Sequence, residues 1–435
     1  FRPKKPPKPC CSGVGAGFPE YRFQSRHLFF GHIIEKKTDR MIDVVLFVAL
    51  RGPASFTGED VVVFHSHSGP AALRTILKLV LAEGIVLAGP GEFTRRAFVN
   101  GRIDLTQAEA VMDMISARSE TALEVAAAHV AGRLQTEIAA LRSDLLDVMT
   151  AVEAAIDFPD DVGPEIDVHF LTARLNEIIA KIDRLIEIGE HGKWAREGLK
   201  IVIIGGPNVG KSSLMNCLVD RERSIVSDIP GTTRDFLEDT FVAGGIPILL
   251  VDTAGIRVAE DPLETLGIQK TWQMVQDADL ILFVVDVGRP LSPQDREIFA
   301  RLSGKPLLLI LNKMDLPESL RSFELPEDWR SLPYIGVSAL YYQGIPELKS
   351  LISETATGGD MKMTDWIVPN LRHQQCLKST LREITLAREG FARQLPFELI
   401  AMNLTAAMHA LQEITGENVR VDILDQIFSR FCIGK

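Results

Sequence analysis

The sequence predicts a multidomain protein with a small α+β domain, an all-α helical bundle, and an α/β domain inserted between the two halves of that bundle. Short β-type runs dominate the first part of the chain. Long helical patterns then flank a central region where short apolar runs alternate with helical segments, which is typical of a mainly parallel sheet covered by helices on both faces. The 435 residues suffice for two or three domains with sizeable cores.

Residues 1–100 form the predicted α+β domain. Gly-Pro and Thr-Gly turns separate its β-type runs, which lie at 28–33, 42–49 and 61–64. Helices are expected at 71–83 and from about Arg95 onward. The region contains no nucleotide motif, so a nucleotide is expected to bind elsewhere in the chain.

The helical bundle is predicted in two pieces, 101–197 and 356–435, on either side of the inserted domain at 198–355. Residues 106–158 are expected to be helical throughout, because apolar residues recur there mainly at steps of three and four and form one stripe. The stripe consists of Leu123, Val130, Leu134, Ile138, Leu141, Leu145, Val148, Val152 and Ile156. Similar patterns follow at 168–188, 371–390 and 396–414. We interpret these stripes as the core of one bundle.

The inserted domain begins with a phosphate-binding motif. An apolar run, 201–204, predicts a buried strand, and residues 205–212 then match G-x-x-x-x-G-K-[ST] before a helix opens at 214–218. In this setting, backbone N–H groups and the helix N-terminus favour bound phosphate. We expect Lys211 to reach the β- and γ-phosphates and Ser212 to ligate Mg²⁺.

Four further motifs follow in the order of a Ras-like P-loop GTPase. The sequence DTAG at 252–255 follows an apolar run and supplies a carboxylate to the Mg²⁺ site, and GTTRD at 231–235 occupies the place of the first switch. In NKMD at 312–315, the Asp315 carboxylate can accept hydrogen bonds from the N1–H and 2-amino groups of guanine, which favours GTP over ATP. Backbone N–H groups of SAL at 338–340 can bind the guanine oxygen.

The predicted nucleotide-binding residues come from the five motifs, from Ser213 directly after the first, and from the four residues before GTTRD. They are Asn208, Val209, Gly210, Lys211, Ser212, Ser213, Ser227, Asp228, Ile229, Pro230, Gly231, Thr232, Thr233, Asp252, Thr253, Ala254, Gly255, Asn312, Lys313, Met314, Asp315, Ser338, Ala339 and Leu340.

The composition bears on three other features: membrane insertion, nucleic-acid binding and the redox compartment. Hydrophobic residues make up 46% and charged residues 24%, as in soluble globular proteins, and no apolar run approaches membrane-span length. The net charge of −11 gives no general support for nucleic-acid binding, so an RNA contact would need a local basic patch. The five cysteines show neither metal nor disulfide spacing, which favours a reducing cytoplasm.

Further motifs outside the GTPase region resemble the TrmE/MnmE family of tRNA-modifying GTPases, over nearly the whole chain. They are PASFTGED at 53–60, PGEF at 90–93, AFVNG at 97–101, DLTQAEA at 104–110, EAAIDFP at 153–159 and the ending FCIGK at 431–435. Other GTPases share only the central domain, so this combination is specific to one family.

The resemblance implies a homodimer formed through an N-terminal domain like those that bind tetrahydrofolate. It implies a flavin-containing partner of the MnmG/GidA type, with two copies of each protein in the complex. Together they would add an aminomethyl or carboxymethylaminomethyl group to C5 of the wobble uridine (position 34) of certain tRNAs. A 5-formyl- or methylene-tetrahydrofolate would supply the one-carbon unit, in the bacterial cytoplasm or, in a eukaryote, the mitochondrion.

The resemblance also implies how GTP is hydrolysed. Ile256 stands where Ras-like proteins place the Gln that orients water. The family uses a glutamate further along the second switch, which matches Glu264, although Glu260 and Asp261 are equally plausible from the residues alone. The direct Mg²⁺ ligands would be Ser212 and Thr233.

No arginine finger is recognisable in the sequence, and the family uses K⁺ in its place as the positive charge between the phosphates. Asn208 matches the K⁺-ligating asparagine, and Ser227, Ile229 and Thr232 would complete the site. If the resemblance to the family is left aside, Asn208 is equally well explained as a residue whose side chain caps its own loop.

Folate contacts are implied at two basic positions, Arg102 and Lys435. Cys432, near Lys435, is a candidate residue of the modification site. The sequence departs from the family in two places. Val63 stands where the family has a folate-contacting Glu, and the family's first strand, with its Arg-containing segment, precedes the first residue of this sequence.

Two other functions remain open at this point. A ribosome-assembly or RNA-chaperone GTPase would share the central domain, but it predicts an RNA-binding module such as a KH domain after it. A one-carbon transferase acting alone is disfavoured by Val63. The leading hypothesis is a GTPase, a hydrolase acting on GTP, that serves tRNA wobble-uridine modification.

Overall fold

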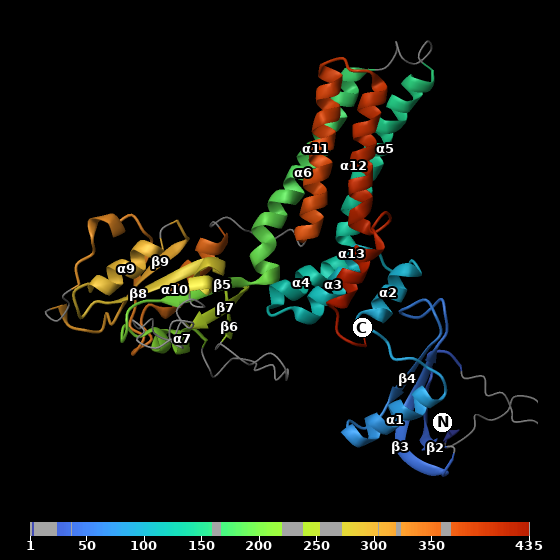
Figure 1. Cartoon of the computed structure of the whole chain (residues 1–435), viewed down its shortest axis with the longest axis horizontal. Coiled ribbons are helices and arrows are strands. Elements are labelled where there is room, and N and C mark those ends of the chain that lie inside the picture. The colour runs from blue at the N-terminus through green and yellow to red at the C-terminus, as the bar shows by residue number, and fades with distance from the viewer. Residues whose placement is uncertain are drawn as a thin grey trace, which may run out of the picture. The chain divides into compact units, whose positions relative to one another are not determined.

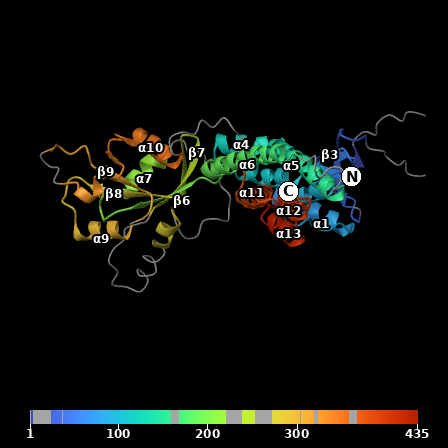
Figure 2. The ribbon, with the colours of Figure 1, turned by 90° about the horizontal axis from the view of Figure 1, so that it is seen from above.

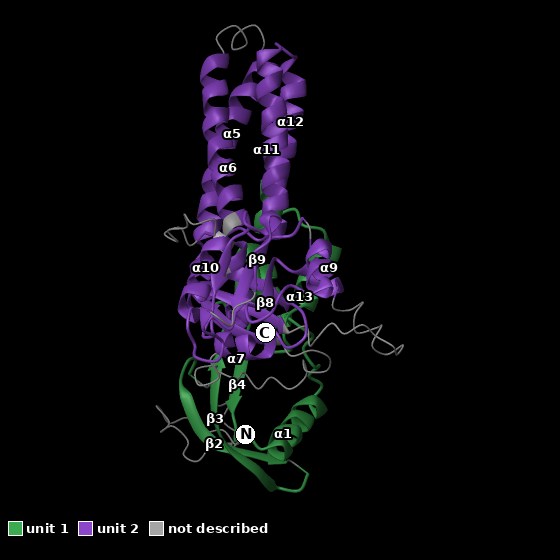
Figure 3. Cartoon of the chain, turned by 90° about the vertical axis from the view of Figure 1, so that its left-hand side faces the viewer, with its two compact units in different colours: residues 1–112, 411–435 green, residues 113–410 purple. Residues whose placement is uncertain are grey.

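The computed structural model describes residues 2–3, 24–35, 37–158, 167–219, 238–252, 272–302, 304–318, 323–357 and 367–434. The chain divides into two compact units, one formed by residues 1–112 and 411–435 and the other by 113–410 (Figure 3). No helix within the described ranges has both the length and the apolar content that a membrane span requires.

An antiparallel sheet begins the first unit. Its strands, in spatial order, are β1 (Arg2–Pro3), β2 (Leu28–Glu35), β3 (Arg40–Leu50) and β4 (Val61–His65). Figure 1 labels the last three. Helix α1 (Pro70–Ala82) covers one face, where Ile76 packs against Ile33 and Val45. The burial of these three apolar side chains holds the helix to the sheet.

The opposite face of this sheet is apolar but exposed. Phe30 pairs with Leu46, and Leu28 pairs with Val48, so these four side chains lie on one face of the pleat. Leu28 is 63% exposed, Phe30 48% and Leu46 41%. Val63, which pairs with Val48 from β4, extends the same face.

The end of the chain packs against residues from its first quarter. Helix α2 (Glu92–Val99), the start of α3 (Leu105–Ser116) and α13 (Val421–Ser429) share a core that includes Leu105, Ala108, Phe428 and Phe431. A β-bridge joins Pro90 to Ile433. The FCIGK ending therefore belongs to the same unit as the N-terminal sheet.

The continuous helix expected at 106–158 is wrong, because the structure has three helices there: α3, α4 (Glu120–Val130) and α5 (Arg133–Asp157). Ser119 caps α4 by accepting a hydrogen bond from the Ala122 N–H, and Gly132, with φ of 85°, separates α4 from α5.

This break changes the predicted stripe. Leu123 is 45% exposed, whereas α4 buries smaller apolar residues and one histidine: Ala122, Val125, Ala126 and His129. Along α5, the expected positions from Leu134 to Val152 are buried.

The remaining long helices form the bundle on both sides of the inserted domain. Helix α6 (Val168–Glu197) precedes that domain and α11 (Leu371–Ala392) follows it, yet the two lie side by side in Figures 1 and 2. Helix α6 also contacts α5, and α12 (Phe397–Thr415) follows α11. The predicted stripe of α6, Leu171, Leu175, Ile178, Ile182 and Leu185, is buried. The prediction of a domain inserted into a helical bundle is confirmed.

The inserted domain is a six-stranded sheet with helices on both faces. The strands are β5 (Leu199–Ile204), β6 (Glu238–Ala243), β7 (Ile246–Asp252), β8 (Leu280–Asp286), β9 (Leu307–Asn312) and β10 (Tyr334–Gly336). Their order is β10-β9-β8-β5-β7-β6, and every pair is parallel except β6 with β7. The mainly parallel sheet predicted from the sequence is therefore confirmed.

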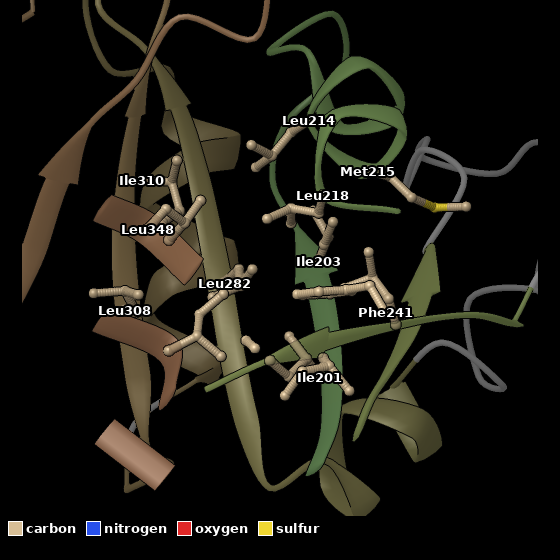
Figure 4. Packing of buried hydrophobic residues seen from close by; sticks show 14 of the residues in the cluster. Ile201, Ile203, Leu214, Met215, Leu218, Phe241, Leu282, Leu308, Ile310 and Leu348 are labelled. Atoms are coloured by element: carbon tan, nitrogen blue, oxygen red, sulfur yellow. The ribbon is translucent and has the colours of Figure 1, made fainter. Parts of the chain in front are cut away.

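Each face of this sheet has its own core. Helices α7 (Lys211–Val219) and α10 (Ile345–Thr357) pack on one face, where Ile201, Leu218 and Leu348 point toward one another (Figure 4). Helix α9 (Pro293–Arg301) and the 3-10 turn η3 (Glu327–Trp329) pack on the other face, around Phe283.

Candidate nucleotide-binding site

Those predicted nucleotide residues that the structure describes lie where the parallel strands end. Strand β5 leads into the phosphate loop, β9 ends at Asn312, and β10 ends shortly before Ser338. The carboxyl ends of parallel strands lie at one edge of a sheet, and ligands of such sheets bind there. The topology therefore brings motifs far apart in sequence to a single edge.

The phosphate loop is shaped by close backbone approaches. A Cβ on Gly205 would lie 2.3 Å from the Val284 carbonyl oxygen, so this position has no room for a side chain. Gly210 has a φ of 96° and Asn208 a φ of 61°, which turn the chain sharply into α7. Helix α7 begins at Lys211, so its first N–H groups lie at the end of the loop.

The Lys211 side chain is buried within this loop, with only 7% of the residue exposed. Its Nζ donates to the carbonyl oxygens of Gly205 at 3.1 Å and Gly206 at 2.8 Å. Two of the three ammonium donors are thereby directed by the loop itself. The cation stands next to the helix N-terminus, which is the arrangement that attracts phosphate.

Asn312 joins the phosphate loop to the base-binding segment. Its Nδ2 donates to the Val209 carbonyl at 2.8 Å, and its Oδ1 accepts from the Ala339 N–H at 3.1 Å. The residue is 2% exposed, so both hydrogen bonds are shielded from water. A Cβ on Gly210 would lie 2.3 Å from the same Nδ2, which explains glycine at that position.

The two segments expected to read guanine lie in direct contact. The Ser338 Oγ donates to Asp315 Oδ1 at 2.6 Å and accepts from the Tyr341 N–H at 3.3 Å. The Met314 N–H donates to the Val337 carbonyl at 3.0 Å, so NKMD and SAL are also joined through the backbone. Asp315, Ser338 and Ala339 are thus assembled in one place.

Sequence reasoning missed an acidic partner of Lys313. The Lys313 Nζ forms an ion pair with Asp286 Oδ2, while Asp286 Oδ1 accepts from the Gly288 N–H at 2.8 Å. Lys313 has a φ of 68°, an uncommon conformation for a non-glycine residue. The available signal was an Asp at the end of the apolar run of β8, at the same edge as the other motifs.

Part of the predicted site lies outside the described residues. This applies to Ser227, Asp228, Ile229, Pro230, Gly231, Thr232, Thr233, Thr253, Ala254, Gly255, Ile256, Glu260, Asp261, Glu264 and Lys435. Asp252 ends β7, and the structure describes its backbone only. Of the predicted Mg²⁺ and K⁺ ligands, Ser212 and Asn208 are placed, both at the phosphate loop.

A second group of predicted residues lies around α2 in the first unit. The Gly91 N–H, just before α2, donates to the Cys432 carbonyl at 3.4 Å, and Cys432 is exposed. Arg102 lies just beyond the other end of α2, where its Cγ would be 3.3 Å from a Cβ on Gly58. A helix of 8 residues is about 12 Å long, so Arg102 and Cys432 are held at opposite ends of α2.

Polar contacts tie the SFTGED loop to α2. The Asn100 Nδ2 donates to the Thr57 carbonyl at 2.8 Å and to Glu59 Oε1 at 3.2 Å, and Arg96 pairs with Glu59 at 3.1 Å and with Glu92. The Gly89 N–H and the Arg96 guanidinium hold the pKa of Glu92 below its usual range. The two glutamates in turn raise the pKa of Arg96.

Comparison with known proteins places this architecture in one family. The family model described as the MnmE helical domain matches residues 105–432, and the model described as the N-terminus of the GTP-binding protein TrmE matches residues 11–102. The chain belongs to the MnmE family. The match at residues 11–102 contains none of the nucleotide motifs, so this part of the relationship does not depend on them.

Relatives named tRNA modification GTPase MnmE align with almost the whole chain. The protein of Natranaerobius thermophilus is 42% identical, and those of Alkaliphilus oremlandii and Bacillus subtilis are 40% identical, each over 95% of this chain and 90% of the relative. A solved structure of Era from Aquifex aeolicus is 27% identical over 43% of this chain and 67% of its own, with a TM-score of 0.31. This MnmE family member is a GTP-hydrolysing enzyme.

We expect Asp315→Asn to weaken GTP binding by more than about tenfold, because hydrogen bonds to a charged group contribute roughly 1.5–3 kcal/mol. The same variant should bind xanthosine triphosphate better, since that base carries an oxygen at the 2-position. Titration with fluorescent nucleotides measures both affinities. Asp328→Asn, an exposed Asp of the same domain, is the control. Unchanged GTP affinity in Asp315→Asn would remove this residue from base recognition.

Proposed function

We propose that this enzyme acts in tRNA modification, where it works with a flavin-dependent partner of the MnmG/GidA type. The complex adds a carboxymethylaminomethyl or aminomethyl group to C5 of the wobble uridine of certain tRNAs, and GTP hydrolysis controls it. The observation that carries this proposal is the relationship to tRNA modification GTPases over 95% of the chain, together with the family-model matches at residues 11–102 and 105–432.

The competing ribosome-assembly function has less support. It predicts an RNA-binding module such as a KH domain after the nucleotide domain. Residues 367–434 instead form the helices α11, α12 and α13, and no strand occurs among the described residues of this range. The segment after the nucleotide domain therefore favours the tRNA-modification hypothesis.

We assign the hydrolytic step to residues of the phosphate loop and of the two predicted switch segments. Lys211 would stabilise the phosphates, and Ser212 and Thr233 would hold Mg²⁺. Glu264 would orient the attacking water, since the side chain of Ile256 has no polar atom with which to do so. Asn208, Ser227, Ile229 and Thr232 would hold K⁺, which would supply positive charge where negative charge develops. Asn208 fits this task because it lies in the loop immediately before the helix N-terminus.

Folate would be held by Arg102 and Lys435 through its carboxylates, and it would supply the one-carbon unit when bound. Arg102 suits this role, since its stem lies along the SFTGED loop and its guanidinium can pair with a carboxylate in two places. The side chain of Val63 offers no polar atom and lies on the exposed sheet face. This side chain therefore cannot replace the hydrogen bond that a Glu at this position would make to the pterin.

The exposed sheet face supports the proposed homodimer. Leu28, Phe30 and Leu46 leave a contiguous apolar surface in the single chain, and such surfaces mark interaction sites. A second copy presents the same face, so the two sheets can bury these side chains symmetrically.

The function is tested by mass spectrometry of tRNA nucleosides. Cells lacking this protein should lose the C5 modification of the wobble uridine, and the wild-type gene should restore it. Cys432→Ser should leave GTP turnover intact and impair modification, because Cys432 belongs to the first unit and the nucleotide site to the second. An unaltered nucleoside profile in the deletion strain, with altered ribosomal subunits, would favour the assembly function. Full modification by Cys432→Ser would show that the thiol has no role in the modification.

Turnover should be fast in K⁺ and about a hundredfold slower in Na⁺ at equal ionic strength, the scale of one lost electrostatic group. The smaller Na⁺ would fit a site built for K⁺ poorly. Asn208→Ala should lose most of this K⁺ response and keep its affinity for GTP. The assay is phosphate release in the two salts. Equal rates in K⁺ and Na⁺ would contradict the cation mechanism and the role of Asn208.

Phe30→Lys should convert the dimer into a monomer, because it places a charge in the centre of the apolar sheet face. Size-exclusion chromatography with light scattering gives the mass. Leu123→Lys, which alters a side chain of 45% exposure on α4, is the matched control and should remain dimeric. A Phe30→Lys protein that keeps the wild-type dimer mass would move the interface elsewhere.

A further inference from the structure

An ion pair outside the predicted motifs lies against the phosphate loop. Asp295 caps α9: its Oδ2 accepts from the Ser292 N–H at 3.0 Å and the Ser292 Oγ at 2.7 Å. Its Oδ1 accepts from Arg289 Nη2 at 3.3 Å. Asp295 is 2% exposed, whereas the Arg289 side chain is 35% exposed. The buried carboxylate therefore has a charged partner that reaches it from the surface.

This pair meets the loop at Gly206. A Cβ on Gly206 would lie 2.5 Å from Asp295 Oδ1 and 2.8 Å from Arg289 Nη2. Gly206 is not among the residues of positive φ, so glycine is required here for space and not for backbone conformation. The paired carboxylate and guanidinium occupy the place that a side chain would take.

The same glycine receives the phosphate-binding lysine. The Gly206 carbonyl accepts from Lys211 Nζ at 2.8 Å, the shorter of the two bonds that direct this ammonium. Any shift of Gly206 therefore moves an acceptor of Lys211. Val284 of β8 lies against the neighbouring Gly205, whereas the Arg289–Asp295 pair lies against Gly206 itself.

We propose that Arg289 and Asp295 are positioning residues for Lys211, acting through Gly206 without touching the nucleotide. Removing Arg289 leaves a buried carboxylate without its charged partner, which is strongly unfavourable. That carboxylate would draw in water or change its rotamer, and the space beside Gly206 would no longer be filled. Displacements of about 1 Å near reacting groups are enough to lower rates by up to about a hundredfold.

The test compares Arg289→Ala with three other variants of the full-length enzyme. Arg289→Ala should lower kcat for GTP roughly ten- to a hundredfold, and Arg289→Lys should recover part of the loss, since it restores the charge without the planar fork. Gly206→Ala should resemble Arg289→Ala, because the added methyl group displaces the pair. Arg296→Ala, an exposed arginine of α9, should behave as wild type.

Helix capping provides the alternative explanation, and Ser292→Ala isolates it. That variant removes a cap of α9 but keeps Arg289, so it should lower Tm and leave kcat unchanged. If Arg289→Ala lowers Tm as Ser292→Ala does while kcat and KM stay within twofold of wild type, the pair only caps the helix and the inference is overturned.

The inference rests on the proposed role of Lys211, which is tested separately. Lys211→Ala should abolish high-affinity binding of a fluorescent GDP analogue. If Lys211→Ala binds and turns over nucleotide normally, the phosphate role fails. If Lys211→Ala loses nucleotide binding but Arg289→Ala keeps the wild-type kcat and KM, only the positioning role of Arg289 is contradicted.

Discussion

The nucleotide site depends on the buried amide of Asn312. This side chain donates to the Val209 carbonyl and accepts from the Ala339 N–H, so it connects loops that follow three different strands. A buried amide that loses one partner leaves a polar group unsatisfied, at a cost of roughly 1–3 kcal/mol. These two hydrogen bonds therefore connect the phosphate loop to the base-binding segment through protein atoms alone.

Three glycines of the phosphate loop allow it to pack closely against its neighbours. Gly205, Gly206 and Gly210 each lie where a Cβ would approach a carbonyl, a carboxylate or an amide at 2.5 Å or less. The loop thus packs against β8, against the cap of α9 and against Asn312. Close packing on three sides leaves the loop backbone few alternative positions, which keeps its N–H groups directed at one anion.

Much of this site could be predicted because its motifs are contiguous in sequence and follow buried strands. The contacts between side chains and residues outside their own motif could not be predicted. Ser292 and Asp295 have the spacing of a helix cap, and that spacing indicates only where α9 begins. Nothing local shows that the same carboxylate meets Gly206, or that Asp286 pairs with Lys313, since strand order decides both contacts.

In the helical region the sequence contained the correct local signals, but the apolar periodicity predicted a single helix across them. Ser119 and Gly132 are ordinary signals for a helix start and a helix end. The large apolar residues nevertheless predicted one continuous stripe. Helix α4 buries alanines and His129, and leaves Leu123 exposed. Side-chain size was therefore a poor guide to burial in α4, where close approach of helices favours small residues.

The junction between α6 and β5 limits how the nucleotide domain can move against the bundle. Helix α6 ends at Glu197 and β5 begins at Leu199, so one residue joins a bundle helix to a central strand of the sheet. Gly198 has a φ of 81°, and a Cβ there would lie 2.8 Å from the Pro247 carbonyl. Trp194 of α6 packs against the core under β5. A displacement of β5 must therefore either carry α6 with it or rotate the backbone at Gly198, because this connection contains no other residue to absorb the movement.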